Sequence, residues 1–187
     1  WKDVRSGFPD VPLKLFGAGT DSGTFDYFTE AINGKAKASR SDYLATEDDN
    51  ITVQGVQGER GALGYFGYSY YAENKDKLRA VPIINKGATK GVSPSLETVM
   101  DGTYQPLARP IFIYVSERSM ARPEVKEFVE FYLKNAPKLT KEVGYVPLDK
   151  MHYDLAMKNF TTKKLGTGFG GTPEVGVKVD DLLKREA

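Results

Sequence analysis

The sequence predicts an α/β protein in which strands alternate with helices. Residues 13–16 alternate apolar and polar side chains, as in a half-buried strand, and a glycine-rich turn follows them. Apolar residues then recur at helical spacing from Phe25 to Ile32, and Gly34 supplies a helix stop. A second amphipathic helix is expected from residue 123, with a proline at its first position. This alternation indicates a sheet flanked by helices.

The remaining elements follow from shorter patterns. Residues 35–50 are polar and are expected to form a long loop, which ends in the helix-cap candidates Asp48, Asp49 and Asn50. Further strands are predicted at 63–66, 78–83 and 109–115, and further helices at 68–77, 95–100 and 148–159. The apolar stripe of the helix that starts at residue 123 should consist of Val125, Phe128, Val129, Tyr132 and Leu133.

Composition limits the classes of function. The 187 residues suffice for one domain or two small lobes. With 26 basic and 25 acidic residues the net charge is +1, which argues against a nucleic-acid partner. The absence of cysteine removes disulfides and thiolate metal sites. No apolar run approaches the ~20 residues that cross a bilayer. The chain opens at Trp1 without an initiator methionine, so we expect a processed or partial chain.

The turn from Gly17 to Thr24 carries the strongest functional signal. A strand that leads through a turn into a helix presents backbone N–H groups without intrahelical partners, and these suit an oxyanion. Gly23 permits close approach of an anion, and Ser22 and Thr24 add hydroxyl donors. The alternative is that Ser22 only caps the helix. The turn lacks the lysine of a P-loop and the glycine spacing of the dinucleotide fingerprint, which disfavours nucleotides.

The same turn carries a family resemblance. Its sequence, Leu-Phe-Gly-Ala-Gly-Thr-Asp-Ser-Gly-Thr-Phe-Asp-Tyr-Phe-Thr-Glu, closely resembles the phosphate-binding receptors of bacterial phosphate ABC importers, the PstS-like proteins. The likeness covers nearly all of the chain, at residues 15–30, 39–43, 47–50, 62–67, 102–110 and 143–148.

The resemblance implies an architecture and a biological role. It implies a type II periplasmic-binding fold, a two-lobed clamp with a mixed sheet flanked by helices. Residues 1–109 would form the second lobe, and residues 110–187 would return to the first. It further implies inorganic phosphate as ligand, delivery to an ABC permease, and a periplasmic or extracellular location. A membrane anchor would lie in a segment outside this chain. Neither catalysis nor a cofactor is implied.

The resemblance also assigns ligands. Ser22, Gly23 and Thr24 match the phosphate ligands of the family. Many members have an arginine four residues before that serine, where this chain has Ala18. Arg40 is the candidate substitute because its guanidinium fork fits a pair of phosphate oxygens, although it could be an ordinary surface residue.

Three roles remain open for Asp21. It could accept a hydrogen bond from protonated phosphate, which would discriminate against sulfate. It could instead orient Arg40 or cap the helix.

Family members carry further phosphate-binding loops, with a key acidic residue, in an N-terminal segment that precedes everything in this chain. We therefore expect half a site here, which binds phosphate weakly or not at all without that segment.

Two rival functions use the same turn. One is a phosphate-ester hydrolase with Ser22 as nucleophile, for which the sequence offers no positioned base and no metal ligand set. The other is a receptor for another oxyanion, such as sulfate or molybdate.

His152, the only histidine, is expected to pack or lie at the surface, and residues 47–49 fit a helix cap better than a calcium loop. The aromatic cluster at residues 65–71 is expected to pack in the core.

Overall fold

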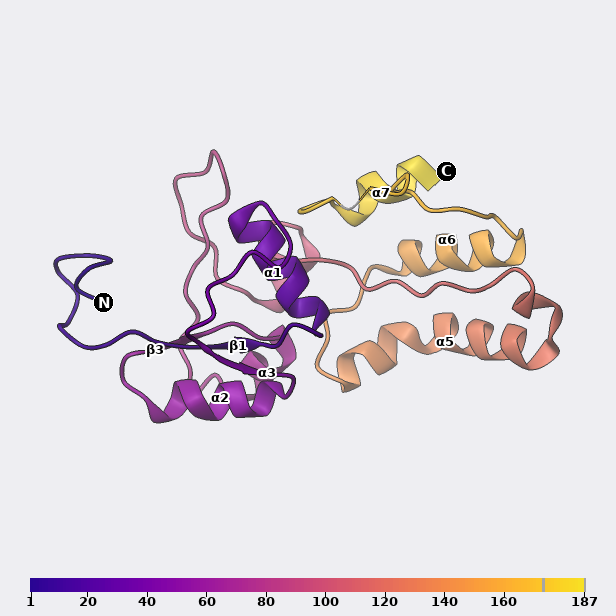
Figure 1. Ribbon diagram of the computed structural model, residues 1–187. Coiled ribbons are helices and arrows are strands. Elements are labelled where there is room, and N and C mark those ends of the chain that lie inside the picture. The colour runs from indigo at the N-terminus through magenta and orange to yellow at the C-terminus, as the bar shows by residue number, and fades with distance from the viewer. Residues whose placement is uncertain (173, 187) are drawn as a thin grey trace. The chain divides into compact units, whose positions relative to one another are not determined.

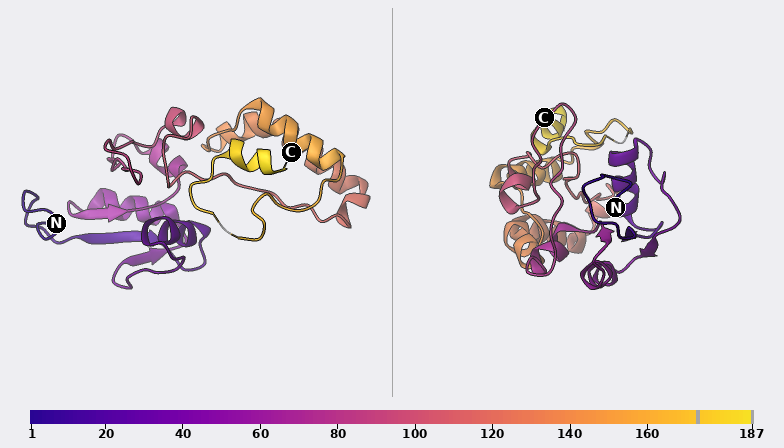
Figure 2. Two further views of the ribbon diagram at one scale, coloured as in Figure 1. Left: turned by 90° about the horizontal axis from the view of Figure 1, so that it is seen from above. Right: turned by 90° about the vertical axis from the view of Figure 1, so that its left-hand side faces the viewer.

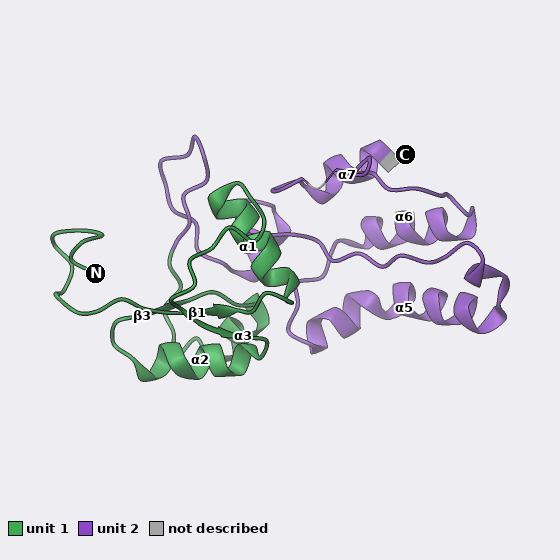
Figure 3. Cartoon of the chain, viewed as in Figure 1, with its two compact units in different colours: residues 1–81 green, residues 82–187 purple. Residues whose placement is uncertain are grey.

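The computed structural model describes residues 1–172 and 174–186. The chain divides into two compact units, Trp1–Val81 and Pro82–Ala187 (Figure 3). Each unit is described below by itself.

Unit 1 is built on a parallel sheet of three strands in the order β2-β1-β3 (Figure 1). The strands are β1 (Lys14–Ala18), β2 (Leu44–Thr46) and β3 (Ala62–Gly64). Two helices connect them, α1 (Gly23–Asn33) after β1 and α2 (Asp49–Gly58) after β2, and they cover opposite faces of the sheet (Figures 1 and 2). Since every strand runs the same way, their carboxyl ends meet at one edge, where ligands of open α/β sheets commonly bind.

Helix α1 begins and ends at the residues that the sequence predicts. Ser22 is its N-cap, and Gly34 adopts the left-handed φ of 72° that ends the helix. Phe25 and Thr29 are its buried residues. The Thr29 hydroxyl donates to the Phe25 carbonyl at 2.8 Å and accepts from the Lys37 amide at 2.7 Å, which ties the following loop to the helix. The predicted strand, turn and helix are confirmed.

Helix α2 is capped by Asp48, whose carboxylate accepts from the Asn50 amide at 2.9 Å, so the predicted cap is confirmed. The helix lies close over β1 at Gly55. A Cβ there would overlap the Phe16 ring, with Phe16 Cζ only 2.9 Å away. The small residue therefore lets the helix approach the sheet, and Thr52 and Val53 are buried beside it. A short helix, α3 (Tyr68–Glu73), completes the regular elements of unit 1.

Unit 2 is helical. Its elements are α4 (Leu96–Met100), the 3₁₀ turn η1 (Ser119–Ala121), α5 (Pro123–Glu142), α6 (Lys150–Thr161) and α7 (Val179–Glu186). Helices α5 and α6 pack together. The apolar core consists of Val129, Leu133 and Ala136 from α5 and of Leu182 from α7. Helices predicted at 95–100, from residue 123 and at 148–159 are therefore confirmed, with their ends moved by a few residues.

Several predictions of local structure are wrong. The expected loop at 35–50 contains β2, and the helix expected at 68–77 stops at Glu73. Residues 78–83 form no strand and contribute one isolated bridge, from Ile83 to Val92. The strand expected at 109–115 is absent from the described chain, because no neighbouring strand there offers it hydrogen-bond partners.

Apolar side chains within residues 109–115 are exposed instead of buried. Tyr114 is 76% exposed, and Ile111, Phe112 and Ile113 are exposed as well. The stripe predicted for α5 is only partly correct, because Val129 and Leu133 are buried whereas Phe128 is 65% exposed. Among the described residues, no helix has both the length and the apolar character needed to cross a membrane.

Candidate anion-binding site

The predicted anion-binding turn lies at the carboxyl edge of the sheet. It leaves β1 at Ala18 and enters α1 at Gly23. The stretch Gly17–Gly19 is buried, whereas Thr20, Asp21 and Gly23 are exposed. The end of the turn that leads into the helix is therefore open to solvent, and the positive end of the helix dipole lies there.

Two of the backbone donors at the start of α1 are already engaged. The Ser22 amide donates to the Gly19 carbonyl at 3.1 Å, and the Thr24 amide donates to Ser22 Oγ at 3.1 Å. The amides of Gly23 and Phe25 belong to the first turn, where no intrahelical acceptor exists. Ser22 therefore caps the helix. Its hydroxyl proton is still available to donate, since a hydroxyl can accept and donate at once.

A side chain that the sequence did not point to reaches into the turn. Glu47 follows β2, and Oε1 of its carboxylate accepts from the Asp21 amide at 3.3 Å. The backbone beside it is held by the Gly19 amide, which donates to the Thr46 carbonyl at 3.0 Å. A Cβ on Gly19 would lie 2.8 Å from Cδ of Glu47 and closer still to Oε1. Gly19 thus leaves the space that the carboxylate fills.

The position of the family arginine is buried. Ala18 is 1% exposed, so the fold leaves no open space at its side chain. Its carbonyl accepts hydrogen bonds from the hydroxyls of Tyr43 at 3.0 Å and Tyr65 at 3.5 Å. The Tyr65 ring stacks on Phe28 of α1, with 3.9 Å between the ring centroids. Burial raises the pKa of Tyr65 well above its ordinary value, so this hydroxyl remains protonated and able to donate.

Arg40, the candidate substitute, lies in the exposed loop before β2. Its guanidinium forms a two-pronged ion pair with the Asp42 carboxylate, and 61% of its side chain is exposed. Tyr43, three residues further along, is fixed to Ala18. The structure thus brings Asp21, Ser22, Gly23 and Thr24 together and leaves Arg40 in the neighbouring loop, paired with Asp42.

Other residues singled out by the sequence have structural roles. His152 is buried on α6, and its Nε2 lies 2.7 Å from Oδ1 of Asp180 on α7. The hydrogen bond from the ring lowers the pKa of Asp180. Asp49 accepts from the Gly67 amide at 3.3 Å, and burial raises the pKa of its carboxyl. In the aromatic cluster, Tyr65 is packed as expected.

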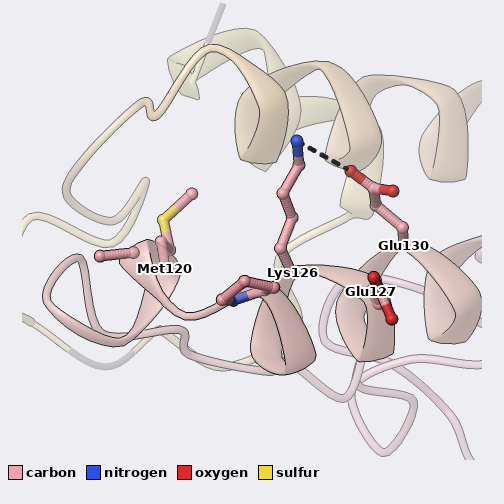
Figure 4. Close-up of a pocket in the computed structure, with 6 residues that line it drawn as sticks. Met120, Lys126, Glu127 and Glu130 are labelled. Carbon is pink, nitrogen blue, oxygen red and sulfur yellow. Dashed lines mark ion pairs between the residues drawn. The ribbon is translucent and has the colours of Figure 1, made fainter.

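Unit 2 carries a shallow depression at the start of α5 (Figure 4). Its lining residues are Met120, Ala121, Pro123, Lys126, Glu127 and Glu130. Lys126 forms an ion pair with Glu130 at 3.8 Å, drawn as the dashed line in Figure 4, and Glu127 adds a further negative charge. The depression is therefore poorly suited to an anion.

Glu47 was missed because β2 was missed. Residues 44–46 are too short and too weakly patterned to be recognised as a strand, so Glu47 could not be placed at a strand end. The available signal was topological. In a parallel sheet, each residue that follows a strand is brought to the same edge as the turn after β1.

Comparison with known proteins places the chain in a family. Residues 1–136 match the model of the PBP superfamily domain. The chain is 53% identical to protein SphX of Synechococcus elongatus over 186 residues, which are 100% of this chain and 55% of that protein. It is 38% identical to the phosphate-binding protein PstS of Staphylococcus haemolyticus over 163 residues, 85% of this chain and 49% of that one. The chain therefore spans about half the length of these relatives.

Solved structures agree with this placement. A protein from Planctomyces limnophilus, described as a possible phosphate binding protein, is 49% identical and superposes with a TM-score of 0.74. The match covers 88% of this chain and 58% of that one. PstS from Borrelia burgdorferi, at 16% identity, supports the fold alone, with a TM-score of 0.51 over 78% of this chain and 57% of that one. The predicted α/β class, with the type II periplasmic-binding architecture, is confirmed. The chain belongs to the PBP superfamily and is a relative of the SphX and PstS proteins.

Proposed function

We propose that this chain carries part of a receptor that binds inorganic phosphate outside the cytoplasm and delivers it to an ABC-type importer. The observation that carries the proposal is the open N-terminus of α1 at the carboxyl edge of a parallel sheet, with Gly23 exposed in it. The names of the relatives support phosphate as the anion, since PstS of Staphylococcus haemolyticus is called a phosphate-binding protein.

The proposed contacts come from the first turn of α1. The amides of Gly23 and Phe25 and the hydroxyls of Ser22 and Thr24 would donate to phosphate oxygens, with no metal or cofactor involved. A helix N-terminus contributes about 0.3–2 kcal/mol to an anion, and each charge-assisted hydrogen bond a net ~1.5–3 kcal/mol. After the cost of ordering the ligand, such a half-site gives a Kd on the order of millimolar, since ~1 mM corresponds to about 4 kcal/mol.

Arg40 is proposed to supply the positive charge that Ala18 lacks. Ala18 is buried under the hydroxyls of Tyr43 and Tyr65, so a cation has to come from outside β1. Release of the exposed Arg40 from Asp42 costs little, because solvent screens ion pairs at an exposed position. Asp21 is proposed either to accept from protonated phosphate or to orient Arg40.

We further propose that other parts of a complete receptor supply the opposing wall of the site. The relatives are about twice as long as this chain. Unit 2 exposes apolar side chains along residues 111–114 and on α5, where Phe128 and Phe131 are 65% and 58% exposed. Apolar surface of this extent is typical of an interface. Residues 110–187 would accordingly belong to the first lobe and residues 1–109 to the second.

A binding role is preferred over hydrolysis. Ser22 Oγ accepts from the Thr24 amide, and no hydrogen bond in the described part of the chain joins it to a histidine or carboxylate base. The ring of His152 is paired with Asp180. A nucleophilic serine needs a general base within hydrogen-bond reach, so turnover of a chromogenic phosphate ester that disappears in Ser22→Ala would contradict the proposal.

The test is a titration of the ¹⁵N-labelled chain with inorganic phosphate, followed amide by amide. We expect saturable shifts of the Gly23 and Phe25 amides in the millimolar range, and smaller shifts with sulfate if a carboxylate accepts the phosphate proton. Ser22→Ala should weaken the response, whereas Ser119→Ala, a serine in the 3₁₀ turn of unit 2, serves as the matched control. Equal, unsaturable shifts across the whole chain would contradict phosphate binding at this turn. Micromolar affinity would contradict the half-site.

A further inference from the structure

Glu47 brings a negative charge to a turn that is suited to receive one. Oε1 of its carboxylate lies 3.3 Å from the Asp21 amide, one residue before Ser22. A carboxylate oxygen and a phosphate oxygen are acceptors of the same kind, and a single N–H forms one strong hydrogen bond. The Asp21 amide borders the proposed donors of the Gly23–Phe25 turn, so an anion bound there would also accept from it and compete with the Glu47 carboxylate.

The backbone at Glu47 is fixed, whereas its side chain is free to leave. Thr46 lies opposite Ala18 in the β1–β2 register and accepts from the Gly19 amide, and Asp48 caps α2. These contacts on either side hold the backbone of Glu47 beside the turn. Glu47 itself is exposed, so its carboxylate can exchange the Asp21 amide for water at small cost.

Gly19 makes this contact possible. Its buried Cα faces the carboxylate, and a Cβ there would collide with Oε1. Gly19 has no positive φ that would require a glycine, and a side chain at this position would displace the Glu47 carboxylate.

We propose that Glu47 is an affinity-determining residue of this site, which holds the Asp21 amide in the free protein and is displaced when phosphate binds. The inference rests on the proposed function, because it names the internal competitor of that ligand. It assigns Glu47 a role that weakens phosphate binding, through occupancy of a donor and through repulsion between like charges.

Three variants separate the two contributions. Glu47→Ala removes both the acceptor and the charge, and should tighten phosphate binding roughly 5- to 10-fold, the equivalent of one hydrogen bond that no longer has to be exchanged. Glu47→Gln removes the charge and keeps an amide oxygen as acceptor, so its affinity should lie between wild type and Glu47→Ala. Glu59→Ala is the control, because it removes one carboxylate whose partner, Lys14, lies at the other end of β1.

The variants are compared by phosphate titration of the ¹⁵N-labelled 187-residue chain at constant ionic strength. Glu47→Ala should also shift the Asp21 amide before any phosphate is added, which shows that the hydrogen bond is present in solution. Affinity in Glu47→Ala that equals wild type or Glu59→Ala would overturn the role of Glu47 and leave the proposed function standing. If no variant responds at Gly23, the proposed function and this inference both fall.

Discussion

The close approach of α2 to β1 can be tested by adding one methyl group to Gly55. A Cβ there would overlap the Phe16 ring, with Cζ at 2.9 Å. Phe16 is a β1 residue inside the sheet, so neither side can move freely. Overpacking of this kind costs about 1–3 kcal/mol, whereas alanine in place of a helical glycine gains up to ~1 kcal/mol.

Gly58 provides the matched control in the same helix. It is exposed, and a Cβ there meets nothing within 4 Å. Because both substitutions add the same methyl group to α2, the helix-propensity gain largely cancels between them. We expect the free energy of unfolding of Gly55→Ala to be about 1–3 kcal/mol lower than that of Gly58→Ala.

Trp1 allows this difference to be measured in unit 1. It is the single tryptophan, and its indole N–H donates to the Gly61 carbonyl at 2.8 Å, directly before β3. Its fluorescence during urea denaturation therefore reports on this sheet. Equal stability of the two alanine variants would refute the packing argument. Phe16→Leu, which trims the ring, should recover part of the loss in the Gly55→Ala background and not in the Gly58→Ala background.

Three further predictions concern caps and ionisable groups. Ser22→Ala should lower the urea midpoint by the equivalent of about 1 kcal/mol, because the Thr24 amide loses its acceptor, and Ser22→Asp should restore it; an unchanged midpoint in Ser22→Ala would show that the cap is dispensable. The hydrogen bond from His152 lowers the pKa of Asp180 in the folded protein. This contact therefore stabilises the fold at a pH above the unfolded pKa of about 3.9, and the stabilisation is lost as the pH falls through the folded pKa. Signals of Leu182 in α7 should follow that loss in an acid titration, and Asp180→Asn should abolish this pH dependence; a variant that still follows the wild-type curve would exclude Asp180 as its origin. The pKa of Tyr65 is raised by burial, so unit 1 should lose stability as the pH rises above the unfolded tyrosine value of about 10, and Tyr65→Phe should remove this alkaline loss when Trp1 fluorescence is followed.

Local signals predicted the part of the fold that surrounds the site. The glycine-rich turn, the serine cap and Gly34 define β1 and α1 within a short stretch of chain, because capping and left-handed turns depend on single residues. Asp48 at the start of α2 is a second example. In these cases the residue type alone predicts the local backbone geometry.

Predictions failed where structure depends on distant partners. Residues 44–46 become a strand because β1 pairs with them, and nothing in their own pattern signals this. Residues 109–115 have the composition of a buried strand but pair with no strand in the described chain. The same reason hid Glu47, whose place at the turn follows from the β1–β2 register. The periodicity of one segment cannot predict its contacts with segments that lie far away in the sequence.

The most direct test of the central claim is to locate an anion at the turn after β1. Arsenate has the shape and the protonation behaviour of phosphate, and its arsenic atom can be placed by anomalous X-ray scattering in crystals of the chain. We predict an arsenic peak within hydrogen-bond reach of the Gly23 amide and Ser22 Oγ, with the Glu47 carboxylate moved away from the Asp21 amide. Arsenate bound elsewhere, with Glu47 still on that amide, would contradict the account.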